Sequence, residues 1–315
     1  MISICLGALL LAAATVGFAV RFAPIPGHRT LYLVIASPLL MVAAPVAIVV
    51  LSSGRRWVLA ALASCLTLAV IVVQLPWYVG SEPDPASVQV RVMTLNMRFG
   101  NADPLAVAHV AEANADVVMV QEFTPAAAKG LADAAMGRTF PYHVLDALPG
   151  TEGLGVYSRY PITDLTHIQD HQVALVSARV RLDRVAHDTT LVSLHLPAPW
   201  PQPIEGWRND IAQFPSALDE LAAQASAGSI LIGGDFNSTI DMQPFRQLLT
   251  NGYRDAAEQA GSGNNLTYPS NRRFPPLIGI DHVLTRNATA VSTSTVEVPG
   301  TDHRALLASV MVPEL

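Results

Sequence analysis

Three long apolar stretches open the chain and predict helices that cross a membrane. They occupy residues 2–20, 30–51 and 57–78, and each is close to the roughly 20 residues that a helix needs to cross about 30 Å of hydrocarbon. Pro38 and Pro45 lie inside the middle stretch, where membrane helices tolerate proline. We therefore expect residues 1–79 to form three transmembrane helices. The alternative is a cleaved signal peptide followed by two core helices, but the first stretch lacks the charged start of a signal peptide.

Short apolar runs follow an acidic, proline-containing linker over residues 80–87 and predict a strand-rich domain over residues 88–315. Alternating apolar positions predict a first strand that ends at Asn96. Asp103 followed by Pro104 predicts the start of a helix that reaches residue 114, and a second helix is expected over 210–225, bent or begun at Pro215. Further strands are expected at 117–120, 154–157, 174–180, 190–194, 230–232, 280–284 and 306–312. This pattern predicts an α/β fold of stacked sheets with outer helices.

Charge divides the chain at the same place. The first 80 residues hold four arginines and no Asp, Glu or Lys, which leaves 15 basic and 25 acidic residues in the remainder, a formal charge of −10. This balance excludes a basic nucleic-acid-binding module. Both cysteines, Cys5 and Cys65, lie in apolar stretches, so the strand-rich domain has no thiol nucleophile. Arg55 and Arg56 in the second loop favour an orientation in which the strand-rich domain faces outward.

Polar residues that suit metal and phosphate chemistry gather where the predicted strands end. Taken singly, each has an ordinary alternative, because Asn and Asp are common turn residues and a Glu or His at a strand end often has no function. Together they predict one site, since neighbouring strand ends meet at one rim and carboxylate and amide oxygens suit Mg²⁺. The set comprises Asn96, Glu122, Glu152, Arg159, His195, Asp235, Asn237, Asp281, Asp302 and His303.

The order of these residues resembles the endonuclease/exonuclease/phosphatase superfamily from about residue 90 to the C-terminus. The most specific motifs are Gly234-Asp235-Phe236-Asn237 and Thr301-Asp302-His303-Arg304. The resemblance implies a deoxyribonuclease-like, four-layered α/β sandwich, here preceded by three transmembrane α-helices. It also implies a metal-dependent hydrolase of ester or phosphoanhydride bonds, in which a water at the metal site attacks directly and no covalent intermediate forms.

The resemblance further implies a role for each residue of the site. Glu122 is expected to be the principal ligand of Mg²⁺, or of Mn²⁺, with Asn96 beside it and Asp302 near the metal. Asp235 is expected to orient or deprotonate the attacking water. The other catalytic roles fall to Asn237, His195 and His303 on the phosphate or nucleophile, to Asp281 behind His303, and to Glu152 paired with His195.

The three apolar stretches, the linker and this domain together resemble a membrane-anchored branch that includes teicoplanin-resistance proteins. That resemblance implies a role in antibiotic resistance for a multi-pass protein of the cell membrane, with an extracytoplasmic domain that acts on a phosphorylated envelope lipid and no inferred protein partner. Arg272 and Arg273 are expected to bind the headgroup, with Phe274 and Leu277 toward the acyl chains, although an ordinary proline-rich loop is the alternative. Two other functions stay open: an extracytoplasmic endonuclease or phosphodiesterase acting on nucleic acid, and a non-catalytic binding module.

Overall fold

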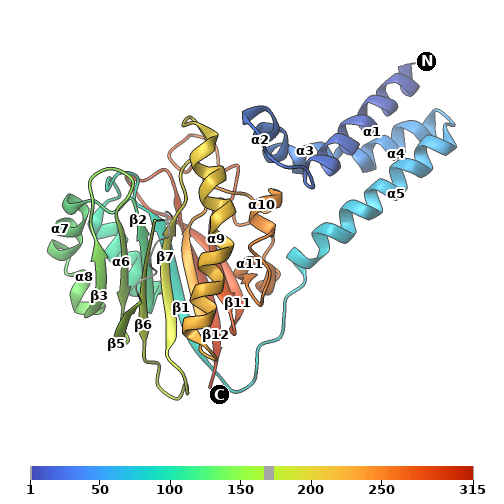
Figure 1. Ribbon diagram of the computed structural model, residues 1–315. Coiled ribbons are helices and arrows are strands. Elements are labelled where there is room, and N and C mark those ends of the chain that lie inside the picture. The colour runs from blue at the N-terminus through green and yellow to red at the C-terminus, as the bar shows by residue number, and fades with distance from the viewer. Residues whose placement is uncertain (1, 167–173, 315) are drawn as a thin grey trace. The chain divides into compact units, whose positions relative to one another are not determined.

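The structure, a computed structural model, describes residues 2–166 and 174–314 of the chain. These residues form two compact units, one made of residues 1–76 and 239–247 and the other of residues 77–238 and 248–315. The first unit contains the apolar N-terminal helices, and the second contains the strands (Figure 1).

Two continuous helices of the first unit are long and apolar enough to cross a membrane. They are α1 (Ile2–Val20) and α5 (Trp57–Gln74), which the short 3-10 helix η1 (Leu75–Tyr78) extends. Most of their side chains are exposed in the isolated chain, with 17% and 11% of the two apolar windows buried. Such exposed apolar surfaces suit contact with lipid.

The middle apolar stretch, which we predicted to be one transmembrane helix, is divided into shorter helices. It forms α2 (His28–Ile35), α3 (Ser37–Met41) and α4 (Ala43–Ser53), with a bend of 54° between α2 and the segment that follows it. Pro38 lies in the first turn of α3, and its ring disfavours continuation of a helix from the preceding residues. The described residues therefore contain two candidate spans, or three if the bent segment is one span.

The second unit is built from two mixed six-stranded sheets. The first sheet has the order β11-β12-β1-β2-β4-β3 and the second β5-β6-β7-β8-β10-β9. The strand bounds are β1 (Ser87–Asn96), β2 (Val117–Gln121), β3 (Tyr142–Asp146), β4 (Leu154–Ser158), β5 (Ile162–Thr166), β6 (Ala174–Val180), β7 (Thr189–His195), β8 (Ile230–Asp235), β9 (Arg254–Asp255), β10 (Asp281–Arg286), β11 (Thr289–Glu297) and β12 (Arg304–Pro313). Within them, β1 runs parallel to β2 and β7 runs parallel to β8.

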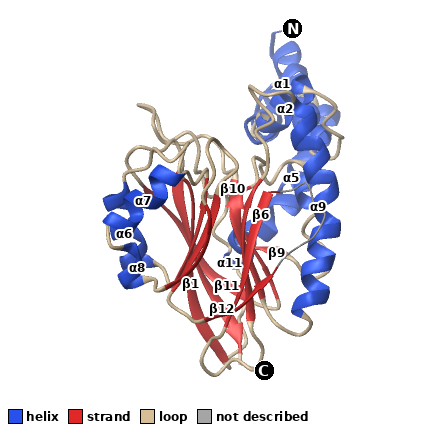
Figure 2. Cartoon of the chain, turned by 60° about the vertical axis from the view of Figure 1, so that its left-hand side comes forward, coloured by secondary structure: helices blue, strands red, loops and turns tan. Residues whose placement is uncertain are grey.

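Helices cover the outer faces of the two sheets (Figures 1 and 2). Helices α6, α7 and α8 lie outside the first sheet and the long helix α9 lies outside the second, so the unit is layered helix, sheet, sheet, helix. The helix bounds in this unit are α6 (Pro104–Asn114), α7 (Pro125–Asp133), α8 (Met136–Thr139), α9 (Ile204–Ala225) and α11 (Ala256–Ala260); α10 (Gln243–Arg246) belongs to the first unit.

The two predicted helices have different outcomes. α6 begins after Asp103, whose side chain accepts a hydrogen bond from the backbone N–H of Ala106 as the predicted cap. α9 begins at Ile204, earlier than predicted, and continues through Pro215. Buried residues lie along one face on both sides of the proline, and their burial outweighs the hydrogen bond that proline removes: Ile204, Trp207, Ile211, Phe214, Leu218 and Leu221.

Alternation along the strands divides the core into layers. On β1, Val90 and Val92 pack in the cluster between the two sheets, whereas Met93 and Leu95 pack in the cluster beneath α6 and α7. Four strands that we did not predict lack this signal: β3, β5, β9 and β11. β3 is mostly exposed, β9 has two residues, and β11 is rich in Ser and Thr with few buried positions.

Two adjacent glycines near the end of β8 lie where a side chain would not fit: Gly233 faces the opposite sheet, and Gly234 faces the neighbouring strand. A Cβ atom on Gly233 would lie 2.5 Å from the Sδ atom of Met119 in the opposite sheet. A Cβ atom on Gly234 would overlap the backbone carbonyl of Leu194 on the neighbouring strand. Any larger residue at 234 therefore has to separate β7 from β8.

We predict that Gly234→Ala lowers the free energy of unfolding by about 1–3 kcal/mol, the usual cost of overpacking a core. Urea unfolding of the full chain in detergent, followed by tryptophan fluorescence, measures it. Gly137→Ala is the matched control, because a Cβ there meets no atom within 4 Å. Equal stability of the two variants would show that the strands have room to spare.

Candidate active site

The inner faces of several strands change from apolar to polar at one end of the sandwich. On β1, Val90 and Val92 are followed on the same face by Thr94 and Asn96, because side chains alternate along a strand. The strand register lines up the other polar ends: His195 of β7 and Asp281 of β10 both lie opposite Asp235 of β8. The alternation that builds the core thus delivers polar groups to one rim between the sheets.

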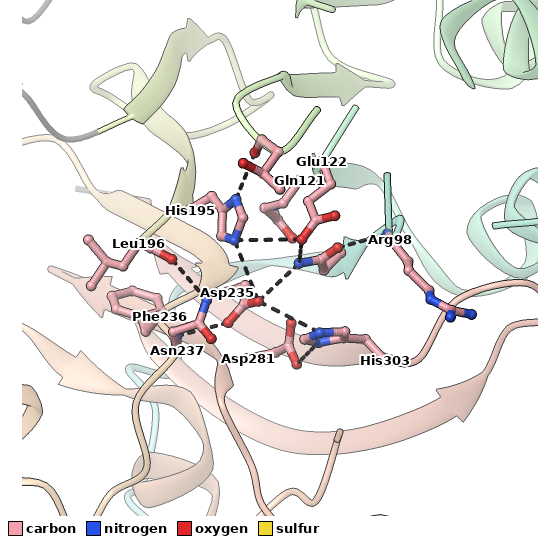
Figure 3. Close-up of polar contacts among 12 residues, drawn as sticks. Arg98, Gln121, Glu122, His195, Leu196, Asp235, Phe236, Asn237, Asp281 and His303 are labelled. Atoms are coloured by element: carbon pink, nitrogen blue, oxygen red, sulfur yellow. Dashed lines mark hydrogen bonds and ion pairs between the residues drawn. The ribbon is translucent and has the colours of Figure 1, made fainter. Parts of the chain in front are cut away.

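Asp235 lies at the centre of this rim (Figure 3). This residue is 1% exposed, and its Oδ2 atom accepts a hydrogen bond of 3.0 Å from Nδ2 of Asn96. The Nε2 atoms of His195 and His303 each lie 3.7 Å from the same oxygen. Burial raises the pKa of Asp235 to about 6; the charge of His303 opposes this rise and that of Asp281 adds to it.

A second carboxylate supports His303 from behind. Asp281 is buried, and its Oδ2 atom lies 2.8 Å from Nδ1 of His303 (Figure 3). Burial acts to lower the pKa of His303, but the charges of Asp281 and Asp235 outweigh burial and raise the pKa to about 10. His303 is therefore an imidazolium at neutral pH, with Nε2–H directed into the site. The ring of Tyr268 packs against it, with centroids 5.0 Å apart.

Glu122 joins the site from the residue after β2. Its backbone has a positive φ of 51°, and its Oε1 atom accepts a hydrogen bond of 3.0 Å from Nδ2 of Asn96. Its Oε2 atom accepts one of 2.6 Å from the backbone N–H of Phe99, and Nε2 of His195 lies 3.9 Å from Oε1. Asn96 thus bridges Glu122 and Asp235, as expected of residues at one metal and phosphate site.

Asn237 turns back toward the same centre. Its backbone N–H donates to Oδ1 of Asp235 over 2.8 Å, and its Nδ2 atom donates to the carbonyl of Leu196 over 2.8 Å. Its φ of 48° is left-handed, a conformation that Asn adopts more readily than most residues. These bonds fix the orientation of the amide, whose remaining polar atom is the acceptor oxygen Oδ1.

The partner of His195 differs from our prediction. Nδ1 of His195 bonds to the backbone carbonyl of Thr151 over 2.9 Å, and Glu152 is an exposed residue one position further along. The predicted pairing of Glu152 with His195 is therefore replaced by a backbone contact. A carbonyl fixes the tautomer as well as a carboxylate does, because Nδ1–H donates to it and leaves Nε2 facing the site.

Asp302 and the two predicted substrate-binding arginines lie at the rim. The carboxylate of Asp302 forms an ion pair of 3.6 Å with Arg98. Arg272 and Arg273 are exposed on a loop that begins at Tyr268, and the backbone N–H of Ser270 in that loop donates to the carbonyl of Asp302 over 2.7 Å. The loop is closed by an isolated pairing of Tyr268 with Ile278.

Several residues of the site carried no sequence signal that we used. Nε2 of Gln121 donates to Oγ of Ser193 across the two sheets over 3.1 Å, and Oγ1 of Thr94 donates to Oε1 of Gln121. Oγ1 of Thr301 donates to the carbonyl of Asn96 over 2.8 Å, which ties the Asp302-His303 motif to β1. Gln121 and Thr301 stand next to the predicted Glu122 and Asp302. Thr94 and Ser193 stand two positions before Asn96 and His195, and the alternation of the strands is the signal that would have found them.

Comparison with known proteins identifies the class to which this fold and site belong. Residues 93–303 match the Endonuclease/Exonuclease/phosphatase family, and no curated protein matches the chain in sequence. The chain belongs to the Endonuclease/Exonuclease/phosphatase family, and it is a metal-dependent phosphoesterase.

Solved structures share the fold at low sequence identity. A humanized D. rerio TDP2 with 14 mutations has a TM-score of 0.57 and 16% identity, with 70% of this chain and 98% of that chain covered. An endonuclease/exonuclease/phosphatase from Bacteroides vulgatus has a TM-score of 0.57 and 18% identity, with 71% and 98% covered. D. rerio TDP2 complexed with a single-strand DNA product has a TM-score of 0.56 and 18% identity, with 70% and 98% covered.

The residues at the rim fit the divalent metal on which this family depends. Glu122 offers a carboxylate with 12% of its side chain exposed, and Asn96 stands beside it. Carboxylate and amide oxygens suit a hard cation such as Mg²⁺, which would supply positive charge for the phosphoryl oxygens. Asp235, Asp281 and His303 also bring ligand atoms within 4.8 Å of one another, but an imidazolium repels a cation, so we assign that group to proton and hydrogen-bond chemistry.

We predict that kcat/KM for bis(4-nitrophenyl) phosphate falls about tenfold per pH unit below about pH 6, because a protonated Asp235 no longer accepts a proton. In His303→Asn the acid limb moves to higher pH, since the lost positive charge was lowering the pKa of Asp235. Profiles at fixed Mg²⁺ measure both effects. His143→Asn, outside the site on β3, is the control. An acid limb that stays in place in His303→Asn would contradict the assigned contact.

Glu122→Gln is expected to weaken Mn²⁺ binding by about 10- to 100-fold, the range found when groups around a metal are altered. The substitution keeps the shape and removes the charge. Titration of the full chain in detergent, followed by the electron paramagnetic resonance signal of free Mn²⁺, reports the affinity. Glu112→Gln on α6 makes the same charge change at an exposed position. Equal affinities in the two variants would remove Glu122 from the metal site.

Proposed function

We propose that this chain is a membrane-anchored, Mg²⁺-dependent hydrolase of a phosphate ester or pyrophosphate carried by an envelope lipid. The observation that carries this proposal is the loop of residues 269–277, which combines two exposed arginines with exposed apolar side chains and follows Tyr268, whose ring packs on His303. A lipid phosphate presents the matching chemistry, an anionic group joined to a hydrocarbon chain.

In the proposed reaction a water attacks phosphorus and passes its proton to Oδ2 of Asp235, while the bond to the leaving oxygen breaks. Asp235 suits this role, because it is ionised above about pH 6 and Asn96 holds the accepting oxygen. The imidazolium of His303 donates a hydrogen bond to a phosphoryl oxygen, Nε2 of His195 faces the same phosphate, and Asn237 orients the nucleophile. Catalysis is then mainly positioning and electrostatic stabilisation, as phosphoryl transfer requires.

The loop of residues 269–277 has the composition and attachment of a headgroup contact. Arg272 is close enough to Tyr268 that its charge acts to lower the Tyr268 pKa, which burial raises, and the Tyr268 ring packs on His303. The side chains of Phe274 and Leu277 are 48% and 63% exposed. Arginines next to the scissile phosphate would bind it or a second phosphate, and the apolar side chains would contact the acyl region.

The N-terminal helices support a substrate that resides in the bilayer. α1 and α5 are apolar enough to anchor the chain in a membrane, and the charge of the first loops favours an outward-facing domain. The same arrangement resembles the branch with teicoplanin-resistance proteins, which would connect the activity to envelope lipids and to antibiotic resistance. Trp200 and Phe99, which follow β7 and β1, are 57% and 56% exposed and add aromatic side chains to the loops beyond those strand ends.

A surface nuclease is the second candidate, favoured by the similarity to TDP2 complexed with single-strand DNA product. The charge of residues 81–315 argues against a nuclease. These residues carry a formal charge of −10 and one lysine, whereas binding a nucleic-acid backbone requires several cationic contacts.

We predict Mg²⁺-dependent phosphate release from a polyprenyl pyrophosphate by the full chain in nanodiscs, and little or no nicking of plasmid DNA or cleavage of sphingomyelin. Asp235→Ala should abolish the activity. Nicking of plasmid with the lipids untouched would replace this proposal by the nuclease. No turnover of any substrate, with Mn²⁺ still bound, would indicate a non-catalytic binding module.

The same assay tests the loop. Arg272→Ala with Arg273→Ala should raise KM for the pyrophosphate about 10-fold or more, since each charge-assisted hydrogen bond contributes on the order of 1.5–3 kcal/mol. Arg181→Ala with Arg184→Ala makes an equal charge change next to the ends of β6 and is the matched control. Normal turnover by the first double variant would exclude the loop from substrate binding.

A further inference from the structure

His282 lies directly after Asp281 but on the opposite face of β10. Because side chains alternate along a strand, Asp281 reaches His303 in the site while His282 points away from it. The side chain of His282 is 5% exposed, and the reaction described above makes no use of it. Its surroundings nevertheless connect it to the segment Asp235–Ser238, which we call the catalytic turn.

Both ring nitrogens of His282 face acceptors. Nδ1 lies 2.7 Å from Oδ2 of Asp255, and Nε2 lies 2.9 Å from the backbone carbonyl of Ser238. Asp255 is buried and is itself fixed, because its Oδ1 atom accepts from the backbone N–H of Ala257 at the start of α11. Since neither partner is a donor, His282 donates through both nitrogens. Asp255 and α11 thus hold the ring in place, and its Nε2–H donates to the carbonyl of Ser238 at the end of the catalytic turn.

The catalytic turn needs such a restraint at its far end. Its first residue, Asp235, is fixed by the register of β8 and by Asn96. Asn237 has a left-handed backbone, so a small rotation there would move its side chain away from the reacting atoms. Beyond it, Oγ of Ser238 donates to the carbonyl of Phe236 and accepts from Nε1 of Trp207. The backbone carbonyl of Ser238 accepts the hydrogen bond from His282.

We propose that His282 is a positioning residue for hydrolysis, and that its Nε2–H bond to Ser238 keeps Asn237 and Asp235 in register with the substrate phosphate. The proposal rests on the roles proposed for Asp235 and Asn237. His282 touches neither substrate nor metal and acts through the backbone of the catalytic turn.

Two conservative variants separate the two bonds of the ring. The amide nitrogen of Gln extends to about the position of Nε2 and can still donate to Ser238, whereas that of Asn is nearer the position of Nδ1 and can only reach Asp255. We expect His282→Gln to keep kcat within about threefold of wild type. His282→Asn is expected to lose kcat about 10- to 100-fold with KM nearly unchanged, the effect of a misplaced catalytic group.

Asp255→Asn provides a third variant that leaves the Ser238 bond in place. Its Oδ1 can still cap α11, and its Nδ2 can donate to Nδ1 of a neutral His282 whose Nε2–H remains on Ser238. We expect kcat within about threefold of wild type. A loss as large as that of His282→Asn would show that the ion pair, and not the bond to the catalytic turn, is what matters, and would overturn the proposal.

Gln259→Ala controls for destabilisation alone. Gln259 is buried and bonds to Thr285 and Ala288 at the other end of β10. All variants are assayed as full chains in nanodiscs with bis(4-nitrophenyl) phosphate, and each melting temperature is recorded. Equal kcat in the Gln and Asn variants, or an equal loss in Gln259→Ala at a matched melting temperature, would overturn the proposal. Activity that survives Asp235→Ala would instead overturn the reaction on which it rests.

Discussion

The structure of the second unit, which contains the site, depends on one buried carboxylate. This is Asp235, which two imidazoles and one amide surround. An isolated buried charge costs several kcal/mol, so Asp235 persists in this position only because His303, His195 and Asn96 lie around a single oxygen. These partners come from three different strands or loops of both sheets. Packing the sheets and assembling the site are therefore one event, and any change that separates the sheets leaves a carboxylate without its partners. The same burial raises the pKa of Asp235 toward neutrality, where a proton acceptor is most useful.

The polar rim and the apolar core between the sheets come from the same alternation. On β8, Leu231 packs in the core, Gly233 makes room for the opposite sheet, and Asp235 completes the face at the site. A hydrogen bond from Gln121 to Ser193 connects the two sheets at this rim. It satisfies two polar groups that would otherwise be buried between the sheets without partners. Thr94, Gln121 and Ser193 thus bond to partners on other strands. Such a network rigidifies the site, and rigidity is what positioning catalysis requires.

Local signals made part of this structure predictable from the sequence. The cap at Asp103 set the start of α6, and apolar runs found the central strands, because burial on both faces leaves a continuous signal. The resemblance in sequence order pointed to Asp235, His303 and Glu122, and the structure brings these three residues to one rim. What could not be predicted were contacts made by the backbone. The carbonyl of Thr151 on His195 and that of Ser238 on His282 have no side-chain signature, and only the fold brings them into range. The edge strands β3 and β11 carry mostly exposed residues, so their sequences lack the apolar alternation that predicts a strand.

A membrane anchor changes what the site has to achieve in order to meet its substrate. Under the proposed function, enzyme and lipid share one bilayer, so their encounter is confined and the effective concentration is high without a large binding surface. A nuclease in solution has to attract a polyanion with many cationic groups, and the acidic balance of residues 81–315 works against that. Two exposed arginines on one loop suffice for a single phosphate group presented at a membrane surface. The net negative charge then acts in favour of the proposed substrate, because it repels extended polyanions and leaves the rim open to a headgroup whose hydrocarbon chain keeps it nearby.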